Sequence, residues 1–319
     1  MAFANSSWTD IAVTTLESRS KKIADNVSDN NALLARMRKK GKARPATGRT
    51  IVEPLAFAEN GNANSYSGYD QLPITAQDVI SAAEFNWKQY AVAVVASGLE
   101  LEVQNTGEEA LFDLMRSRLE VAENSMANKM STDIYGDGTT NGSKSITGLD
   151  AAIPLDPTTG TYGGIDRSVY TFWRTIDNDV QITASNLVDE MNETWVQLCR
   201  GSEHPDLIVM GNEAFGYYLS HVQDLQRFGT SELAELGFQT LKFMNADVVL
   251  DGGVGGNAVT DDVYFINTDY MHLRFAPKRN FKALKTRHPH NQDAEIAILT
   301  WAGNLTCSCQ FLQGRIDGD

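Results

Sequence analysis

The chain has few of the features that mark secreted and membrane proteins. Its 319 residues include only three cysteines, Cys199, Cys307 and Cys309, and the last two lie too close along one strand to bridge, so we expect no disulfide framework. The longest uninterrupted apolar run, residues 90–96, is far shorter than the roughly 18–20 residues that a membrane span needs. The first residues lack a basic region followed by a long apolar stretch, so we predict no secretory signal and a cytosolic product.

Basic residues are in the minority and unevenly spread. The chain holds 27 Lys and Arg against 41 Asp and Glu, a formal charge of −14 at pH 7, which excludes a uniformly basic nucleic-acid coat. Residues 1–50 carry 10 basic and 4 acidic side chains, a net +6, so the remaining 269 residues carry −20. With 42% apolar residues the chain can bury a substantial core.

Residues 31–49 contain cations and no acid. The cations are Arg36, Arg38, Lys39, Lys40, Lys42, Arg44 and Arg49. They indicate either a basic arm that binds nucleic acid or a partner, or a solvated helix end, because Asp29 or Asn31 could cap a helix over residues 32–38 before Gly41. A basic arm on an acidic body would also suit pairing with acidic surface on an adjacent copy of the chain.

Two extended segments predict a long hairpin. Residues 49–57 are β-branched and aromatic, and Pro54 places this strand on an edge because it lacks a backbone donor. After about twenty turn-rich residues, residues 79–97 predict a second strand, whose change of alternation phase implies a bulge or strong twist. An isolated ribbon is marginally stable in water, so we predict that it lies on another copy. The predicted contact residues are Phe57, Tyr66, Tyr69, Asp70, Phe85 and Trp87.

The strongest helix signal follows this hairpin. Thr106 and Glu109 form a capping-box pattern, and apolar residues then recur at three- and four-residue steps up to Ile134. The pattern predicts a helix of about 28 residues that serves as a spine.

Short apolar strands alternate with helices over roughly residues 150–280, which predicts a mixed α/β domain. The alternation from Leu305 to Phe311 predicts a final strand whose apolar face packs on the spine helix.

No enzyme signature is complete. The sequence lacks a phosphate-binding loop, a nucleophile elbow and a zinc-protease motif, and the glycine-rich residues 252–256 precede a predicted strand rather than a helix. His288 and His290 could hold a metal with Asp293, but Pro289 and the lack of a further spaced ligand weigh against it. We predict a protein without enzymatic activity, metal or cofactor, and keep a metal enzyme built on these residues as an alternative.

Several short strings occur in a characteristic order and spacing. They are Tyr66-Ser-Gly-Tyr-Asp70 with Trp87-Lys88, Ile134-Tyr-Gly-Asp-Gly-Thr139, Gly163-Gly-Ile-Asp-Arg-Ser168 with Trp173-Arg174, Pro205-Asp-Leu-Ile-Val-Met210 leading into Phe215-Gly-Tyr217, and Tyr264-Phe-Ile-Asn267 before Leu273. Together with the succession of arm, hairpin, spine helix, mixed lobe and returning strand, they resemble the major capsid protein of tailed double-stranded DNA bacteriophages over nearly the whole chain.

The resemblance implies an α+β fold with four parts. These are an N-terminal arm at 1–46, an extended β-hairpin loop at 47–98, a peripheral domain with a long spine helix from 99–148 and 281–319, and a mixed α/β axial domain at 149–280. It implies a structural subunit that self-assembles into pentamers and hexamers of an icosahedral shell around double-stranded DNA, held without sequence specificity. It also implies separate scaffold, portal and, in some cases, cementing proteins, a place in the virion, assembly in the host bacterial cytoplasm and no membrane contact.

Two departures from the family and two alternatives complete the expectations. Between Arg49 and Trp87 there is no lysine, so the isopeptide bond that welds some shells of this family is not expected, and we predict a noncovalent shell. The hairpin begins only about fifty residues into the chain, so any scaffold should be a separate protein. The alternatives are an encapsulin-like nanocompartment shell that encloses protein cargo, and a DNA-binding module that uses residues 36–49.

Overall fold

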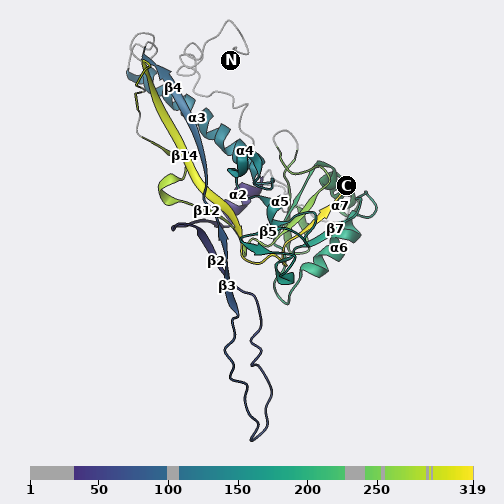
Figure 1. Cartoon of the computed structure of the whole chain (residues 1–319). Helices are drawn as coiled ribbons and strands as arrows, with labels where there is room; N and C mark the ends of the chain where they lie inside the picture. Colours follow the sequence, from purple (N-terminus) through teal and green to yellow (C-terminus); the bar gives the residue numbers. More distant parts are fainter. Residues whose placement is uncertain are drawn as a thin grey trace.

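The computed structural model describes residues 32–98, 108–226, 241–252, 256–284, 287–288 and 290–318. Figure 1 shows a rounded lobe, a long helix and sheet that extend to one side of it, and a thin hairpin that projects away from both. Most of the predicted arm, Thr106 of the capping box, part of the glycine-rich stretch and Pro289 lie outside the described residues. None of the described helices is long and apolar enough to cross a membrane.

The described helices and strands alternate along the chain. The helices are α2 (Ala32–Lys39), α3 (Glu108–Asp133), α4 (Thr140–Ser143), α5 (Leu149–Ala152), α6 (Leu187–Leu198) and α7 (Asn212–Gln226), with the 3₁₀ helices η2 (Thr171–Trp173) and η4 (Pro277–Arg279). The strands are β1 (Ala43–Pro45), β2 (Ile51–Ala56), β3 (Ile80–Phe85), β4 (Lys88–Ser97), β5 (Thr161–Tyr162), β6 (Ile165–Asp166), β7 (Ile176–Asp179), β8 (Leu207–Met210), β9 (Leu241–Phe243), β10 (Ala246–Leu250), β11 (Val263–Ile266), β12 (Met271–Phe275), β13 (Lys282–Ala283), β14 (Ala294–Cys307) and β15 (Gly314–Asp317).

A six-stranded mixed sheet forms the centre of the lobe, in the order β7-β15-β11-β8-β10-β9. The central strands β8 and β11 are buried at every position, which explains why their sequences are continuously apolar rather than alternating. Apolar side chains of α6 and α7, among them Met191 and Tyr218, share one core with Ile208 of β8 and Phe265 of β11. The two helices therefore shield this apolar face of the sheet from water.

A second sheet links the lobe to the long helix α3. Its central strand is β14, which pairs on one side with β4 and on the other with β12 and β13. Strand β1 pairs in parallel with β12. One face packs on α3, where Val94, Ala122 and Ala297 form a small core. Figure 1 shows α3 running beside β4 and β14. The long helix expected before the glycine turn is present as α3.

Two strand predictions need correction. Residues 79–97 form two strands in different sheets, since β3 pairs with β2 while β4 pairs with β14, so the predicted bulge is a change of sheet. The predicted hairpin region at 47–98 thus includes β4, which belongs to the second sheet and not to the hairpin. The final strand expected over 305–311 is wrong in extent, because β14 ends at Cys307 and the chain continues into β15 of the lobe.

The predicted packing of this last segment on the helix is nevertheless present. Leu305 and Cys307 are fully buried and share the large core with Met126, Met130 and Ile134 at the end of the spine. Burial raises the pKa of the Cys307 thiol to about 12, so the thiol stays protonated at neutral pH and packs as a small apolar side chain.

Strand β15 also brings a buried ionic cluster into the lobe. The guanidinium of Arg315 lies 2.6 Å from the carboxylate of Asp262 and 3.2 Å from that of Asp150. Burial raises the pKa of Asp262 and of Asp177 to about 6, although the charge of Arg315 acts in the opposite direction. One oxygen of each of these two carboxylates is buried without a hydrogen-bond partner. The cluster therefore holds negative charge that is poorly compensated at neutral pH.

We expect the ionic cluster to stabilise the lobe more in mild acid than at neutral pH. The pKa of Asp177 is about 6 in the folded chain against an ordinary 3.8, so between these values the folded state binds the proton more tightly and stability is lost as the pH rises through 6. Asp177→Asn should raise the thermal unfolding midpoint of the purified protein at pH 7, and this gain should shrink at pH 5. Glu193→Gln, on the exposed side of α6, is the control and should not change the midpoint at either pH. A gain that grows toward pH 5 would contradict the assignment.

Candidate assembly interface

The hairpin consists of two strands that pair only with each other. β2 and β3 run antiparallel from the pair Ile51–Phe85 to the pair Ala56–Ile80, and Phe57 donates its backbone N–H to the carbonyl of Val79 at 3.0 Å. Both strands are edges, so the missing donor of Pro54 interrupts no ladder, as predicted. Beyond this point the chain continues as an extended loop that projects from the body (Figure 1).

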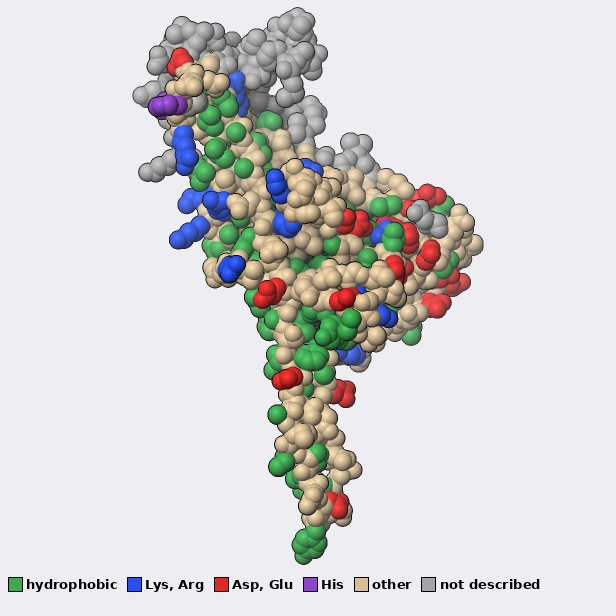
Figure 2. Space-filling model, viewed as in Figure 1, with side chains coloured by type: hydrophobic (Ala, Val, Ile, Leu, Met, Phe, Trp, Pro, Cys, Tyr) green, Lys and Arg blue, Asp and Glu red, His purple; other side chains and the backbone are tan. Residues whose placement is uncertain are grey.

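The projecting loop leaves large apolar side chains in water. Tyr69 is fully exposed, Ile74 is 91% exposed, and Tyr66 and Leu72 are more than half exposed. Figure 2 shows apolar side chains along this loop and at its tip. Monomeric proteins seldom hold such residues on a two-stranded ribbon without a surface to cover them. The predicted contact residues Tyr66, Tyr69 and Asp70 are therefore free to meet another molecule.

The base of the hairpin packs on its own chain. Phe85 is only 4% exposed, and the edge of its ring meets the ring of Tyr162 at a centroid distance of 5.1 Å. The predicted contact of Phe85 with a neighbour is therefore corrected, because the side chain is buried inside its own chain. Phe57 also has an internal partner, since its ring lies 6.1 Å from that of Phe172.

Trp87 marks the point where the hairpin joins the second sheet. Its indole N–H donates a hydrogen bond of 3.0 Å to the backbone carbonyl of Gly48, and the ring packs against the large core. Of the six predicted contact residues, those near the base thus stabilise the subunit, and those near the tip remain available for a partner.

A buried ion pair fastens the hairpin to the second sheet. Glu53 of β2 is 5% exposed and accepts two hydrogen bonds from the guanidinium of Arg274 on β12, at 2.6 and 2.9 Å. The hydroxyl of Thr306 on β14 donates to the same carboxylate at 2.9 Å. Charge-assisted pairs with this bidentate geometry are directional, so this contact fixes the orientation in which the hairpin leaves the body.

Most cations of the predicted arm contact their own chain. Three of them form ion pairs with acids of the lobe and its edge: Arg36 with Asp247 at 3.6 Å, Lys40 with Asp206 at 2.7 Å, and Lys42 with Asp269. These three cations thus have acidic partners within their own chain, and their pairing with an adjacent copy stays a prediction. The segment lies against the body because α2 buries Leu33 and Met37 in the core and β1 pairs with β12.

The remaining arm cations lie at the surface. Lys39, Arg44 and Arg49 are exposed and form no ion pair within the described part of the chain, and the guanidinium of Arg38 lies 5.6 Å from the centre of the Phe281 ring. Of the two interpretations of this segment, the structure supports a helix end, because α2 ends just before Gly41, which has a positive φ of 68°.

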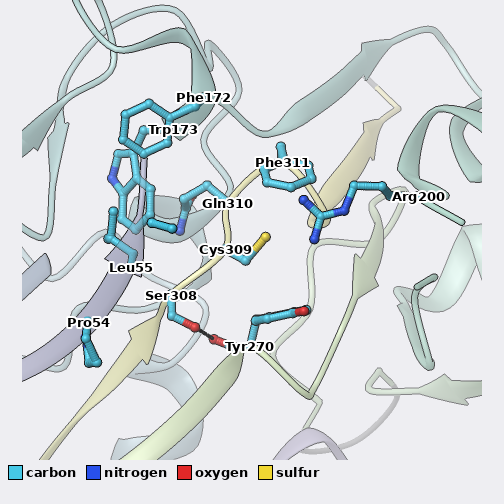
Figure 3. A pocket seen from close by; sticks show the side chains of 11 residues that line it. Pro54, Leu55, Phe172, Trp173, Arg200, Tyr270, Ser308, Cys309, Gln310 and Phe311 are labelled. Atoms are coloured by element: carbon cyan, nitrogen blue, oxygen red, sulfur yellow. Dashed lines mark hydrogen bonds between the residues drawn. The ribbon is translucent and has the colours of Figure 1, made fainter. Parts of the chain in front are cut away.

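A cavity of about 280 Å³ lies where the base of the hairpin meets the lobe. Figure 3 shows Leu55 and Trp173 lining one side of the cavity and Arg200 lining the other, with Tyr270 and Cys309 between them. Burial raises the pKa of the Cys309 thiol to about 11, so the thiol stays protonated at neutral pH, and none of the lining residues is a histidine. The cavity therefore offers no pair of nucleophile and general base.

The proposed metal ligands do not form a cluster. His288 is 75% exposed, and its Nε2 lies 3.4 Å from a carboxylate oxygen of Glu295. Within the described ranges, no group of three or more His, Cys, Asp or Glu side chains is arranged to hold a metal ion. The alternative of a metal enzyme gains no support from this geometry.

Solved structures resemble the chain although its sequence matches no family model and no curated protein. The capsid asymmetric unit of cyanophage A-1(L) has a TM-score of 0.67 and 15% identity, over 92% of this chain and 94% of that one. The capsid of the native GTA particle has a TM-score of 0.56 and 10% identity, over 92% and 91%. The SrpI encapsulin complex of Synechococcus elongatus has a TM-score of 0.57 and 7% identity, over 95% and 94%.

The chain has the tailed-phage capsid fold. This confirms the predicted α+β class, and the likeness is one of fold, with 15% identity or less in each of these comparisons.

Within this capsid fold, sequence reasoning missed the anchor of the hairpin. Glu53 shares the buried side of β2 with Ile51 and Leu55, an acid at a position where the alternation calls for an apolar residue. This acid on an otherwise apolar face was the sequence signal for an ion pair, because a charge on a buried face requires a partner. The partner Arg274 lies 221 residues further along the chain, and no local pattern points to it.

We expect Glu53→Ala to lower the free energy of unfolding by about 3 kcal/mol, because it leaves the partly buried guanidinium of Arg274 without its carboxylate. Glu84→Ala changes an exposed acid of the same hairpin and should alter stability by no more than about 0.5 kcal/mol. Denaturant unfolding of the purified protein measures both. Equal losses in the two variants would show that the anchor carries no special weight.

Proposed function

We propose that the chain is the structural subunit of an icosahedral bacteriophage head, which self-assembles into pentamers and hexamers and forms the shell around double-stranded DNA. The observation that carries the proposal is the hairpin on this capsid fold, which is anchored at its base while the apolar side chains of its tip are exposed. A chain that projects an uncovered apolar loop of this kind can cover it by binding another copy, and repeated contacts of that kind build a lattice. The protein then acts by assembly and not by catalysis.

The charge of the chain fits this role. A net charge of −14 gives a surface that repels DNA, so packed DNA can lie against the shell without sequence-specific binding. We propose that the shell is noncovalent, is part of the virion and is assembled in the host bacterial cytoplasm. Separate scaffold, portal and, in some cases, cementing proteins would complete it.

The division into an arm, an extension loop, a peripheral domain and an axial domain remains our proposal. The strand pairings favour two adjustments to its boundaries: β4 and β12 belong with β14 in the peripheral sheet, and β15 belongs to the axial sheet.

An encapsulin-like shell is the second candidate, because the SrpI encapsulin has a TM-score of 0.57 with this chain. The higher TM-score and identity of the cyanophage capsid favour the phage head. Nuclease-treated particles from infected cells that hold genome-length DNA support the phage head, whereas particles that hold protein cargo support the encapsulin-like shell.

We expect the hairpin tip to be needed for assembly and not for folding. Replacement of residues 58–78 by Asn-Gly would close the hairpin with a two-residue turn between Phe57 and Val79, which already pair. The shortened chain should keep the thermal midpoint of the wild type within a few degrees, while shells seen by negative-stain electron microscopy should fall at least tenfold. Normal shells from this variant would contradict the proposed role of the hairpin.

A further inference from the structure

The sequence contains two Asn-Gly pairs, and both lie at the surface. Asn60-Gly61 belongs to the projecting loop of the hairpin, Asn141-Gly142 belongs to α4, and all four residues are exposed. An asparagine side chain that precedes glycine can react with its own backbone, because the glycine has no Cβ to block the approach of its nitrogen. The two pairs share this chemistry, so the backbone around each of them decides which one reacts.

The side chain of Asn60 is folded over the backbone that follows it. Its Oδ1 accepts a hydrogen bond of 3.0 Å from the backbone N–H of Asn62, which keeps the side-chain carbonyl close to the intervening Gly61 peptide. A donor on that oxygen also stabilises the negative charge that develops there when a nucleophile attacks the carbonyl carbon. A Cβ placed on Gly61 would meet only the side chain of Gln77, at 3.6 Å, so the surroundings leave room for the reaction.

The second pair is held in a conformation that opposes the same reaction. Asn141, Gly142 and Ser143 all have positive φ, at 54°, 66° and 61°, and form a left-handed turn. The backbone N–H of Ser143 donates to the carbonyl of Thr139 at 2.9 Å, and Nζ of Lys88 donates to the carbonyl of Ser143 at 2.5 Å. This turn must open before the side chain of Asn141 and the next backbone nitrogen can form a ring.

We propose that Asn60 is a site of spontaneous deamidation through a succinimide formed with Gly61. The backbone nitrogen of Gly61 gives its proton to water and bonds to Cγ of Asn60, while the bond from Cγ to the side-chain nitrogen breaks and that nitrogen leaves as ammonia. Water then opens the ring at one of its two carbonyl carbons. Opening at Cγ leaves an aspartate in an ordinary backbone, and opening at the backbone carbonyl leaves an isoaspartate, whose chain runs through Cβ. Water is the only co-reactant.

The reaction changes both the charge and the path of the loop. Either product adds a carboxylate to residues 50–87, which contain five acids and no Lys or Arg, so no cation of the hairpin compensates it. Isoaspartate also adds one carbon to the backbone close to Asn62. The side chain of Asn62 joins the two arms of the loop, because its Nδ2 donates to the carbonyl of Thr75 at 2.6 Å and its Oδ1 accepts from the Thr75 hydroxyl at 2.9 Å. The modification therefore loosens the loop where its arms meet.

Incubation of the purified full-length protein, folded and in urea, tests the proposal. Peptide mass spectrometry follows the gain of about 1 Da when a carboxylate replaces the amide, and labelling with an isoaspartyl methyltransferase identifies isoaspartate. The chain in urea gives the intrinsic rate of each Asn-Gly pair. In the folded protein, Asn60 should convert within about threefold of its rate in urea, whereas the hydrogen-bonded turn should slow Asn141 at least tenfold.

Two variants serve as matched controls. Gly61→Ala keeps the asparagine and should slow its conversion about tenfold, because a Cβ hinders the attack. Asn60→Asp carries the product charge from the start, and the aged wild-type protein should elute with it from an anion exchanger. Thermal unfolding shows that both variants fold.

Two results would overturn the inference. One is a folded protein in which Asn60 is slowed as strongly as Asn141, and the other is a Gly61→Ala variant that converts at the wild-type rate. The inference goes beyond the proposed function and does not depend on it, because the reaction needs only an exposed loop and water. The shell function is tested separately by the chain shortened at 58–78.

Discussion

The buried pair between Glu53 and Arg274 is the contact on which the rest of the structure depends. A carboxylate removed from water is costly unless a cation and hydrogen-bond donors replace the lost hydration. Here the replacement comes from Arg274 on β12 and Thr306 on β14, so Glu53 is compensated only while the hairpin stays against the second sheet. The same contact that satisfies the charge therefore sets the direction of the hairpin.

This anchor divides the hairpin into two physically different halves. Near the base, Phe85 and Phe57 find aromatic partners in their own chain, and Trp87 finds a backbone acceptor. Toward the tip, the side chains of Tyr69 and Ile74 are exposed to water. The cations of residues 36–49 divide in a similar way, since those that meet acids of the lobe hold the segment in place. The hairpin and the basic segment, which the sequence analysis treats as contact surfaces throughout, thus each pack partly on their own chain and expose only some of their side chains.

Local pattern was enough to predict the elements but not their partners. The spine helix and the first hairpin strand follow from periodicity and from turn residues close in sequence. In the sequence, the separation of β3 from β4 is visible only as a change of phase in the alternation of apolar residues. No local pattern indicates that β4 pairs with a strand about two hundred residues later. The buried position of Phe85 likewise depends on Tyr162, a contact between distant segments. Pairings of this kind are set by tertiary packing, which overrides what neighbouring residues indicate.

The connection between β14 and β15 explains how the two sheets act together. Only residues 308–313 separate the strand that anchors the hairpin from the strand that enters the lobe. The side-chain amide of Gln313 accepts from the backbone N–H of Asn267 at 2.8 Å and donates to its carbonyl at 3.1 Å, and Arg167 donates to Gln310. These buried hydrogen bonds leave the connection little freedom to act as a hinge. Since the hairpin is anchored to one sheet and β15 lies inside the other, a displacement of the hairpin base is transmitted to the lobe.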